Sequence, residues 1–277
     1  MKRNRRSISH YPYILWSIIF IVIPIFLIVY FSLISSDQSF TINNYKKLFN
    51  STYMLVFFNS IKLALISTII CFFLGYPIAY IISKASTKIR NILMLFLIIP
   101  MWMNFLLRTY AWMSILGKNG ILSTIISFLG FKPLDILYTD AAVILGMVYN
   151  FLPFMIIPIY TVLIKIDKDV LKAASDLGAN RFVIFKRIIF PLSIPGVMSG
   201  VTMVFMPAVS TFVISKLLGG GQFMLIGNLI ESQFTTVGDW YFGSAISILM
   251  MIIILISMTV LSKFDKKSNL TGGGRLW

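Results

Sequence analysis

Charge, cysteine and histidine are all scarce in this sequence. Only 12% of its 277 residues are charged and 58% are hydrophobic, whereas roughly a quarter of the residues in soluble proteins are charged. So few charges cannot cover the surface of a soluble domain of this size. Because Cys71 and His10 are the only residues of their kinds, a disulfide framework, a thiolate metal site and most histidine-based catalysis are excluded.

Negative charge is scarcer than positive charge. Nine acidic residues stand against 24 basic ones, which gives a net charge of +15. The basic residues lie in short flanks between apolar runs, a pattern that indicates membrane orientation rather than nucleic-acid binding. No Gly-x4-Gly-Lys-Ser/Thr phosphate loop occurs, so ATP hydrolysis by that route is excluded. We therefore expect an all-α integral membrane protein with no catalytic residues, metal or cofactor, and no nucleic-acid partner.

Apolar runs of about 20 residues, the length that crosses a bilayer as a helix, occur six times. The predicted spans are Tyr13–Ser35, Phe57–Ile82, Ile92–Leu116, Ala141–Ile164, Ser193–Ile214 and Phe242–Leu261. The first run follows a basic leader, but it is too long for a signal peptide and lacks a small-residue cleavage site. We therefore expect it to be an uncleaved anchor helix.

The basic residues predict the orientation of these spans. One side of the predicted membrane collects Lys2, Arg3, Arg5, Arg6, Lys84, Lys88, Arg90, Lys165, Lys168, Lys172, Arg181, Lys186, Arg187, Lys263, Lys266, Lys267 and Arg275. The opposite side has only Lys46, Lys47, Lys118, Lys132 and Lys216. Since basic loops stay in the cytoplasm, both termini are predicted to be cytoplasmic.

Glycine marks two further segments. The outer segment 215–241 is semi-apolar and contains Gly219, Gly220 and Gly221, which is compatible with a re-entrant or interfacial helix and equally with a surface loop. Gly196 and Gly200 form a small-xxx-small face on the fifth predicted span. Such a face predicts close helix packing, within this chain or against another subunit.

The strongest signal is the charged internal segment from Asp169 to Arg187. Gly178 predicts a left-handed turn between two short helices, and Pro191 is expected to stop the second one. Leu171, Ala174 and Leu177 share a helical face. The segment is either an elbow that docks a partner or an amphipathic loop lying on the membrane.

This segment resembles the cytoplasmic "EAA" loop of bacterial ABC importer permeases, which seats in a groove of the ATPase subunit. The matching positions are Ala173, Ala174, Gly178, Ile188 and Pro191, whereas Lys172 replaces the usual Glu and Phe190 the usual Leu. The resemblance implies an ATPase-coupling set of Lys172, Ala173, Ala174, Asp176, Leu177, Gly178, Ile188 and Pro191. The lysine puts in doubt a salt bridge at its position, but not the docking mode.

The resemblance extends along the whole chain to the polyamine (spermidine/putrescine) permease family. Its motifs are Arg108–Trp112, Leu116–Gly120, Val148–Phe154, Leu217–Gly221 and Ile226–Phe234. It implies a type I importer permease fold with an N-terminal anchor and outer loop (1–56), a transmembrane core (57–262) that contains the coupling loop (165–191), and a cytoplasmic tail (263–277).

The partners implied are two ATPase copies, a sister permease and an extracytoplasmic polyamine-binding protein. Related permeases for ferric iron, thiamine or other small solutes share much of the pattern, so the substrate stays open among them. A membrane channel is the less favoured alternative, because it would not need the helix–glycine–helix elbow.

Polar residues in and beside the spans give candidates for the substrate pathway. A polyamine requires carboxylates or aromatic faces for its ammonium groups, but the predicted spans contain no acidic residue. Candidates are Tyr149 and Asn150 beside Pro153, expected to face a cavity, and Glu231, Asp239 and Trp240, expected at an entrance. Lys62 is expected to extend to the headgroups, and Arg108 either pairs structurally or serves an outer gate.

Overall fold

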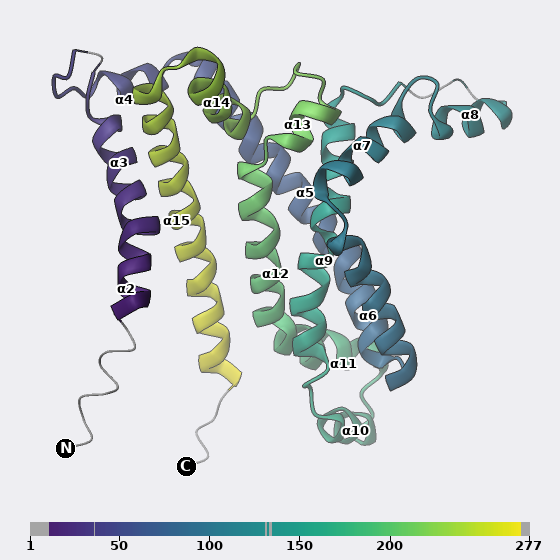
Figure 1. Cartoon of the computed structure of the whole chain (residues 1–277). Coiled ribbons are helices and arrows are strands. Elements are labelled where there is room, and N and C mark those ends of the chain that lie inside the picture. Colours follow the sequence, from purple (N-terminus) through teal and green to yellow (C-terminus); the bar gives the residue numbers. More distant parts are fainter. Residues whose placement is uncertain (1–10, 36, 131, 133–134, 273–277) are drawn as a thin grey trace, which may run out of the picture. The chain divides into compact units, whose positions relative to one another are not determined.

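The structure is a computed structural model that describes residues 11–35, 37–130, 132 and 135–272, with side chains described up to Val260. The basic leader from Lys2 to Arg6, His10 and Arg275 lie outside the described residues. Every named element is a helix, and the described part of the chain contains no strand beyond one isolated bridge between Ile34 and Phe40. The helices (Figure 1) are α2 Tyr11–Ser17, η1 Ile18–Val22, α3 Ile23–Ser32, α4 Asn43–Leu48, α5 Ser51–Lys84, α6 Thr87–Trp102, α7 Phe105–Leu116, α8 Ile121–Phe128, α9 Asp140–Leu163, α10 Lys168–Asp176, α11 Arg181–Ile184, η2 Phe185–Ile189, α12 Phe190–Ser210, α13 Val213–Leu218, α14 Ile226–Ser232, η3 Gln233–Val237 and α15 Trp240–Gly272.

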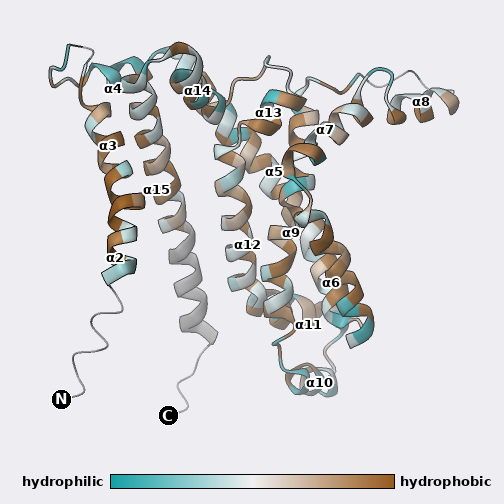
Figure 2. Cartoon of the chain, viewed as in Figure 1, coloured by the Kyte–Doolittle hydropathy of each residue, from teal (hydrophilic) through white to brown (hydrophobic). Residues whose placement is uncertain are grey.

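The predicted all-α membrane fold is confirmed. Five helices of the described chain are long and apolar enough to cross a membrane, and a bent pair makes a sixth. The five are Tyr11–Ser32, Ser51–Lys84, Asp140–Leu163, Arg181–Ser210 and Trp240–Val260. Hydrophobic residues are frequent on α3, α6 and α9, whereas hydrophilic residues gather on α10 and at the turn into α6 (Figure 2).

The third predicted span, Ile92–Leu116, is wrong as a single helix. α6 ends at Trp102, and the segment that starts at Phe105 continues at 93° to it. Pro100 removes one backbone donor from the last turn of α6, which weakens the helix there. The Asn104 side chain then accepts a hydrogen bond of 2.8 Å from the Leu106 amide and starts α7 as a separate helix.

The prediction that Pro191 stops a helix is also wrong. Helical backbone runs without a break from Arg181 to Ser210, with Pro191 in the first turn of α12. The five residues before α12 form the π-helical turn η2, Phe185–Ile189. A wider turn accommodates a proline, which has no amide to donate and whose ring crowds the preceding turn. The predicted coupling loop is therefore continuous with the fifth span.

The chain divides into two compact units, each described here by itself. The first unit comprises residues 1–57 and 229–253, and the second comprises residues 58–228 and 254–277. α5, α14 and α15 each contribute residues to both units.

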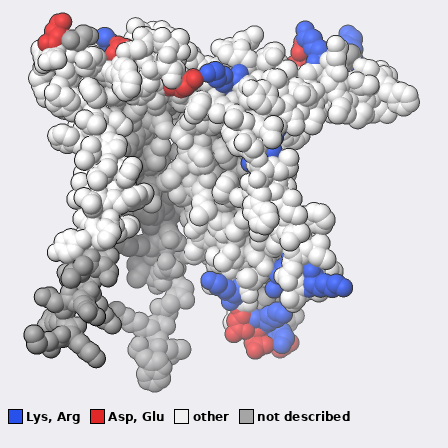
Figure 3. Space-filling model, viewed as in Figure 1, with Lys and Arg blue, Asp and Glu red and all other residues white. Residues whose placement is uncertain are grey.

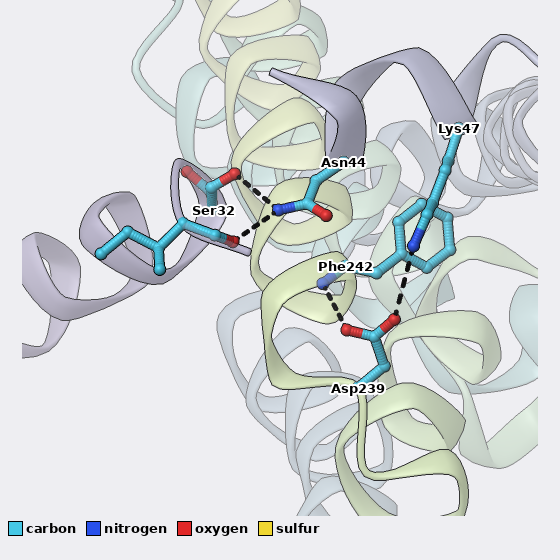
Figure 4. A network of polar contacts seen from close by, with 6 residues as sticks. Ser32, Asn44, Lys47, Asp239 and Phe242 are labelled. Atoms are coloured by element: carbon cyan, nitrogen blue, oxygen red, sulfur yellow. Dashed lines mark hydrogen bonds and ion pairs between the residues drawn. The ribbon is translucent and has the colours of Figure 1, made fainter. Parts of the chain in front are cut away.

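In the first unit, polar side chains close the ends of α3 and α15 (Figure 4). Asn44 donates hydrogen bonds to the carbonyls of Ser32 (3.2 Å) and Ile34 (2.9 Å), which the end of α3 leaves unpaired. Asp239 accepts a hydrogen bond of 3.0 Å from the Phe242 amide and so caps α15. The ammonium of Lys47 lies 3.9 Å from Asp239 and 5.7 Å from the centre of the Phe242 ring.

In the second unit, α12 packs directly on α9 through its two glycines. A side-chain carbon added at Gly196 would lie 2.8 Å from the Pro158 carbonyl oxygen and 3.0 Å from Cα of Ile159. One added at Gly200 would lie 2.8 Å from the Met155 sulfur and 3.1 Å from its carbonyl oxygen. The small-xxx-small face therefore packs within this chain, because larger residues would push the two backbones apart.

We predict that Gly200→Leu destabilises the protein by about 1–3 kcal/mol, the usual cost of overpacking a filled contact. Ser199→Leu, a matched change at the exposed neighbouring position, should leave stability nearly unchanged. Thermal unfolding of the purified protein in detergent measures both. Equal unfolding temperatures for the two variants would contradict the packing described here.

Candidate functional site

The segment predicted to be a coupling loop turns sharply at Gly178. Gly178 has φ +84°, the left-handed backbone that the sequence predicts there. The Ala179 amide donates to the Ala174 carbonyl (3.1 Å) and the Gly178 amide to the Ser175 carbonyl (2.9 Å), which together form a Schellman motif. On the far side of the turn, the Asn180 side chain accepts a hydrogen bond from the Val183 amide and caps α11. Both helix ends at the turn are thus fixed by hydrogen bonds.

Exposed apolar side chains surround this turn. Leu177 is 89% exposed, Phe182 71% and Val170 47%. Ala173 is exposed beside them, whereas Leu171 and Ala174 are half-buried. The sequence analysis did not select Val170 and Phe182 as candidate docking residues. The signal available for them was an apolar side chain within a charged segment. An exposed apolar patch with a polar surround is typical of a protein-binding surface.

The remaining predicted coupling residues lie along the same stretch. Lys172 forms an ion pair of 3.0 Å with Asp169 on the same face of α10, with both side chains largely exposed. Since exposed pairs of this kind contribute little, both charges remain available to a partner. Asp176 is exposed at the end of α10, Ile188 is half-buried in η2, and Pro191 is exposed at the start of α12.

Tyr149 and Asn150 lie in the middle of α9 and face different surroundings. Asn150 is 2% exposed, its amide nitrogen donates 2.9 Å to the Gly146 carbonyl, and its Oδ1 is buried without a donor. Tyr149 is 37% exposed, and its ring packs edge-on against that of Trp112 in α7, with 5.2 Å between the centroids. α9 therefore carries, at consecutive sequence positions, a partly exposed aromatic ring and a buried oxygen without a hydrogen-bond donor.

The two basic residues predicted inside spans differ in burial. Arg108, in α7, is 9% exposed, and its Nε is buried without a hydrogen-bond acceptor. Lys62 is exposed on α5, as expected for a lysine that extends to headgroups. The structure therefore separates a buried cation from an exposed one.

The three entrance candidates belong to the first unit. Asp239 both caps α15 and pairs with Lys47, so it already has structural tasks. Trp240 is 55% exposed and packs edge-on against Phe234, with 5.4 Å between the centroids. Glu231 is half-buried in α14. Asp239 and Trp240, which are consecutive in the sequence, thus both lie at the start of α15.

Segment 215–241, predicted to lie on the outer side, is largely helical rather than a surface loop. It contains the end of α13, α14 and η3, and its residues Leu225, Ile226 and Leu229 are buried. Within the second unit, the Ile226 amide donates 2.8 Å to the Ser60 hydroxyl of α5. Among the described residues, no cluster of three or more His, Cys, Asp or Glu side chains could hold a metal ion.

Comparison with known proteins identifies the class. Residues 72–268 match the family described as "binding-protein-dependent transport system inner membrane component". The chain belongs to this family and is a multi-pass integral protein of the inner membrane, the permease component of a transport system rather than an enzyme.

The chain is similar throughout to curated polyamine permeases. It is 41% identical to the spermidine/putrescine transport system permease protein PotB of Haemophilus influenzae, over 92% of each chain. It is 39% identical to PotB of Escherichia coli, over 88% of this chain and 92% of that one.

Solved structures support the fold. The chain matches a bacterial ABC transporter involved in the import of the acidic polysaccharide alginate, with a TM-score of 0.83, 16% identity and 96% of both chains covered. The MetNI methionine ABC transporter matches with a TM-score of 0.57 and 15% identity, over 76% of this chain and 93% of that chain. These likenesses establish the type I importer fold that the sequence predicted.

We predict that Asn150→Leu leaves stability within about 1 kcal/mol of the parent, because the apolar group of similar size removes the unsatisfied buried Oδ1 along with a single hydrogen bond to the Gly146 carbonyl. Asn150→Asp should lower stability by at least about 2 kcal/mol, since it places a carboxylate there without a partner. Thermal unfolding in detergent distinguishes the two. A stable aspartate variant would show that Oδ1 is not buried as described.

Proposed function

We propose that the chain is a permease subunit of an ATP-driven importer for polyamines, spermidine or putrescine. The observation that carries the proposal is the 41% identity to the H. influenzae PotB permease over 92% of each chain. The exposed apolar coupling loop supports it, since it gives a chain without a phosphate loop of its own a surface for an ATPase.

The assembly we propose contains this permease, a sister permease, two ATPase copies and an extracytoplasmic polyamine-binding protein. Both termini and α10 then lie in the cytoplasm, as the distribution of basic residues predicts. The division into an N-terminal anchor (1–56), core (57–262), coupling loop (165–191) and tail (263–277) belongs to the same proposal.

ATPase docking rests on the elbow. Leu177, Phe182 and Val170 supply the apolar contact, Ala173, Ala174 and Gly178 let a groove wall approach closely, and Lys172 and Asp176 supply rim charges. Ile188 and Pro191 lie in the stretch that joins the elbow to the fifth span. Closure of the ATPase dimer moves the elbow, and the unbroken helix Arg181–Ser210 carries that motion into the membrane.

Motion of α12 reaches the substrate pathway through its glycine contacts with α9. Because Gly196 and Gly200 hold the two backbones at close range, α9 moves with α12 and carries Tyr149 and Asn150. The partly exposed Tyr149–Trp112 pair offers aromatic faces to a polyamine ammonium. The unpaired Oδ1 of Asn150 can accept a hydrogen bond from it once movement of α9 uncovers that buried atom. In this proposal, alternating access results from the joint movement of α12 and α9, which displaces Tyr149 and Asn150.

Positive charge controls the same pathway. Arg108 lies one helical turn before Trp112, and as a buried cation it repels a polyamine that is not held by other groups. We assign Arg108 to an outer gate and Lys62 to the headgroup region of α5. Glu231, Asp239 and Trp240 line the entrance, where carboxylates and an aromatic face attract the polycation.

We predict that cells lacking this chain lose uptake of labelled spermidine or putrescine and regain it when the chain is restored. Thiamine and ferric iron uptake, measured alongside, should not change. Loss confined to one of those other solutes would keep the transporter and contradict the polyamine assignment.

We predict that Gly178→Val abolishes polyamine uptake, whereas Gly178→Asn retains most of it. No atom lies within 4 Å of a side-chain carbon added at Gly178, so only the left-handed backbone penalises substitution. A β-branched residue tolerates that backbone poorly and asparagine tolerates it well. Uptake is normalised to the amount of each variant in the membrane, and equal uptake by the two variants would argue against the elbow as the coupling element.

A further inference from the structure

A cavity of about 590 Å³ opens beside the coupling loop, within the second unit. It lies where α5 turns into α6, and its opposite wall comes from the end of α9, the start of α10 and η2. Lys and Arg side chains gather at this end of the unit, with acidic side chains at the tip (Figure 3). The coupling function described above makes no use of this cavity.

The lining of the cavity is positively charged. Its charged lining residues are Lys84, Arg90 and Lys168, and no acidic side chain of the described residues lines it. Two acids lie near Lys168 in the sequence but do not line the cavity: Asp167 accepts a hydrogen bond from the Asp169 amide, and Asp169 lies 3.0 Å from Lys172. The cavity therefore concentrates three cations without a neutralising carboxylate on its walls.

Contacts within the protein position two of the three cations, Arg90 and Lys84. Nη2 of Arg90 donates to the carbonyls of Ser83 (3.3 Å) and Ala85 (3.1 Å), whereas its Nε is buried without an acceptor. The ammonium of Lys84 lies 4.3 Å from the centre of the Tyr80 ring. The protein thus orders this charge before any ligand arrives.

The first turn of α6 adds donors to the same wall. Ser86 is the N-cap of this 16-residue helix, and its side chain makes no capping hydrogen bond. Ser86 and Thr87 both line the cavity, which therefore lies at the start of α6, the positive end of the helix dipole. Together with the three cations, they form a site for a phosphate group.

We propose that this cavity binds the phosphate of an anionic phospholipid headgroup. Ile81, Ile89 and Ile92, on the helices that flank the turn, are 63%, 53% and 47% exposed, which leaves apolar surface for acyl chains. Basic pockets at the cytoplasmic ends of membrane helices bind such headgroups. A polyamine is repelled by this lining, so the cavity is separate from the substrate pathway.

Bound lipid would act on coupling through α10. Lys168 and Leu171 of that helix form part of the cavity wall, so a phosphate held there fixes the elbow relative to α5 and α6. Assignment to the cytoplasmic leaflet rests on the proposed function, whereas lipid binding itself does not. A failure of the proposed function would therefore appear in the uptake measurement, whereas a failure of the lipid proposal would appear in the lipid affinity.

The test uses the full chain in nanodiscs of phosphatidylcholine with increasing phosphatidylglycerol, and counts retained phosphatidylglycerol by native mass spectrometry. Lys84→Gln with Lys168→Gln removes two cavity charges but leaves the Arg90 contacts that shape the turn. The matched control, Lys88→Gln with Lys186→Gln, removes two exposed charges from α6 and η2 outside the cavity.

We expect about 10-fold weaker phosphatidylglycerol binding in the cavity variant and parental binding in the control. Equal loss in both variants would show unspecific attraction to the basic end of the protein and would overturn the site. If inorganic phosphate displaces phosphatidylglycerol only when the phosphate is far more concentrated than the lipid, the result supports the lipid as the ligand. Displacement at equal concentration would overturn the lipid assignment in favour of a soluble phosphate.

Discussion

The close contact between α9 and α12 is the constraint on which the rest of the second unit depends. At positions 196 and 200 only glycine fits, because a side chain would collide with Met155, Pro158 and Ile159 of α9 at these distances. In a bilayer there is little hydrophobic drive between helices, so packing at this range supplies much of the association. It also joins the two helices into one packed pair, which connects the elbow at Gly178 to the polar centre of α9.

The elbow at Gly178 connects α10 to the packed pair of helices α9 and α12. A hinge of loose chain at residue 178 would absorb any push on α10, but the Schellman hydrogen bonds and the Asn180 cap fix both sides of the turn. The π-helical turn before Pro191 then lets the helix continue into the membrane instead of ending. In the proposed function, a partner binds the exposed Leu177 and Phe182 side chains, because the exposed Lys172–Asp169 pair contributes little binding energy.

Sequence reasoning succeeded where one local rule dominates. Apolar length predicted the spans, and glycine between two helix-forming stretches predicted the left-handed turn found at Gly178. It failed where two rules compete: apolar length hid the break at Trp102–Phe105, and the helix-breaking rule for proline ignored the π-turn that accommodates Pro191. It could not find the Asp239–Lys47 contact or the cavity around Arg90, because these join residues that lie far apart in the chain or depend on the path of a turn.

The central claim is that the elbow and α9 move together through the glycine contact. Spin labels at exposed Phe182 in α11 and exposed Thr161 in α9, in a Cys71→Ser background, report the distance between them by double electron–electron resonance. In the assembled transporter, with and without a non-hydrolysable ATP analogue, the account predicts one narrow distance distribution that does not shift. A shift of several ångströms on nucleotide binding would show that α12 slides over α9, and would contradict the account.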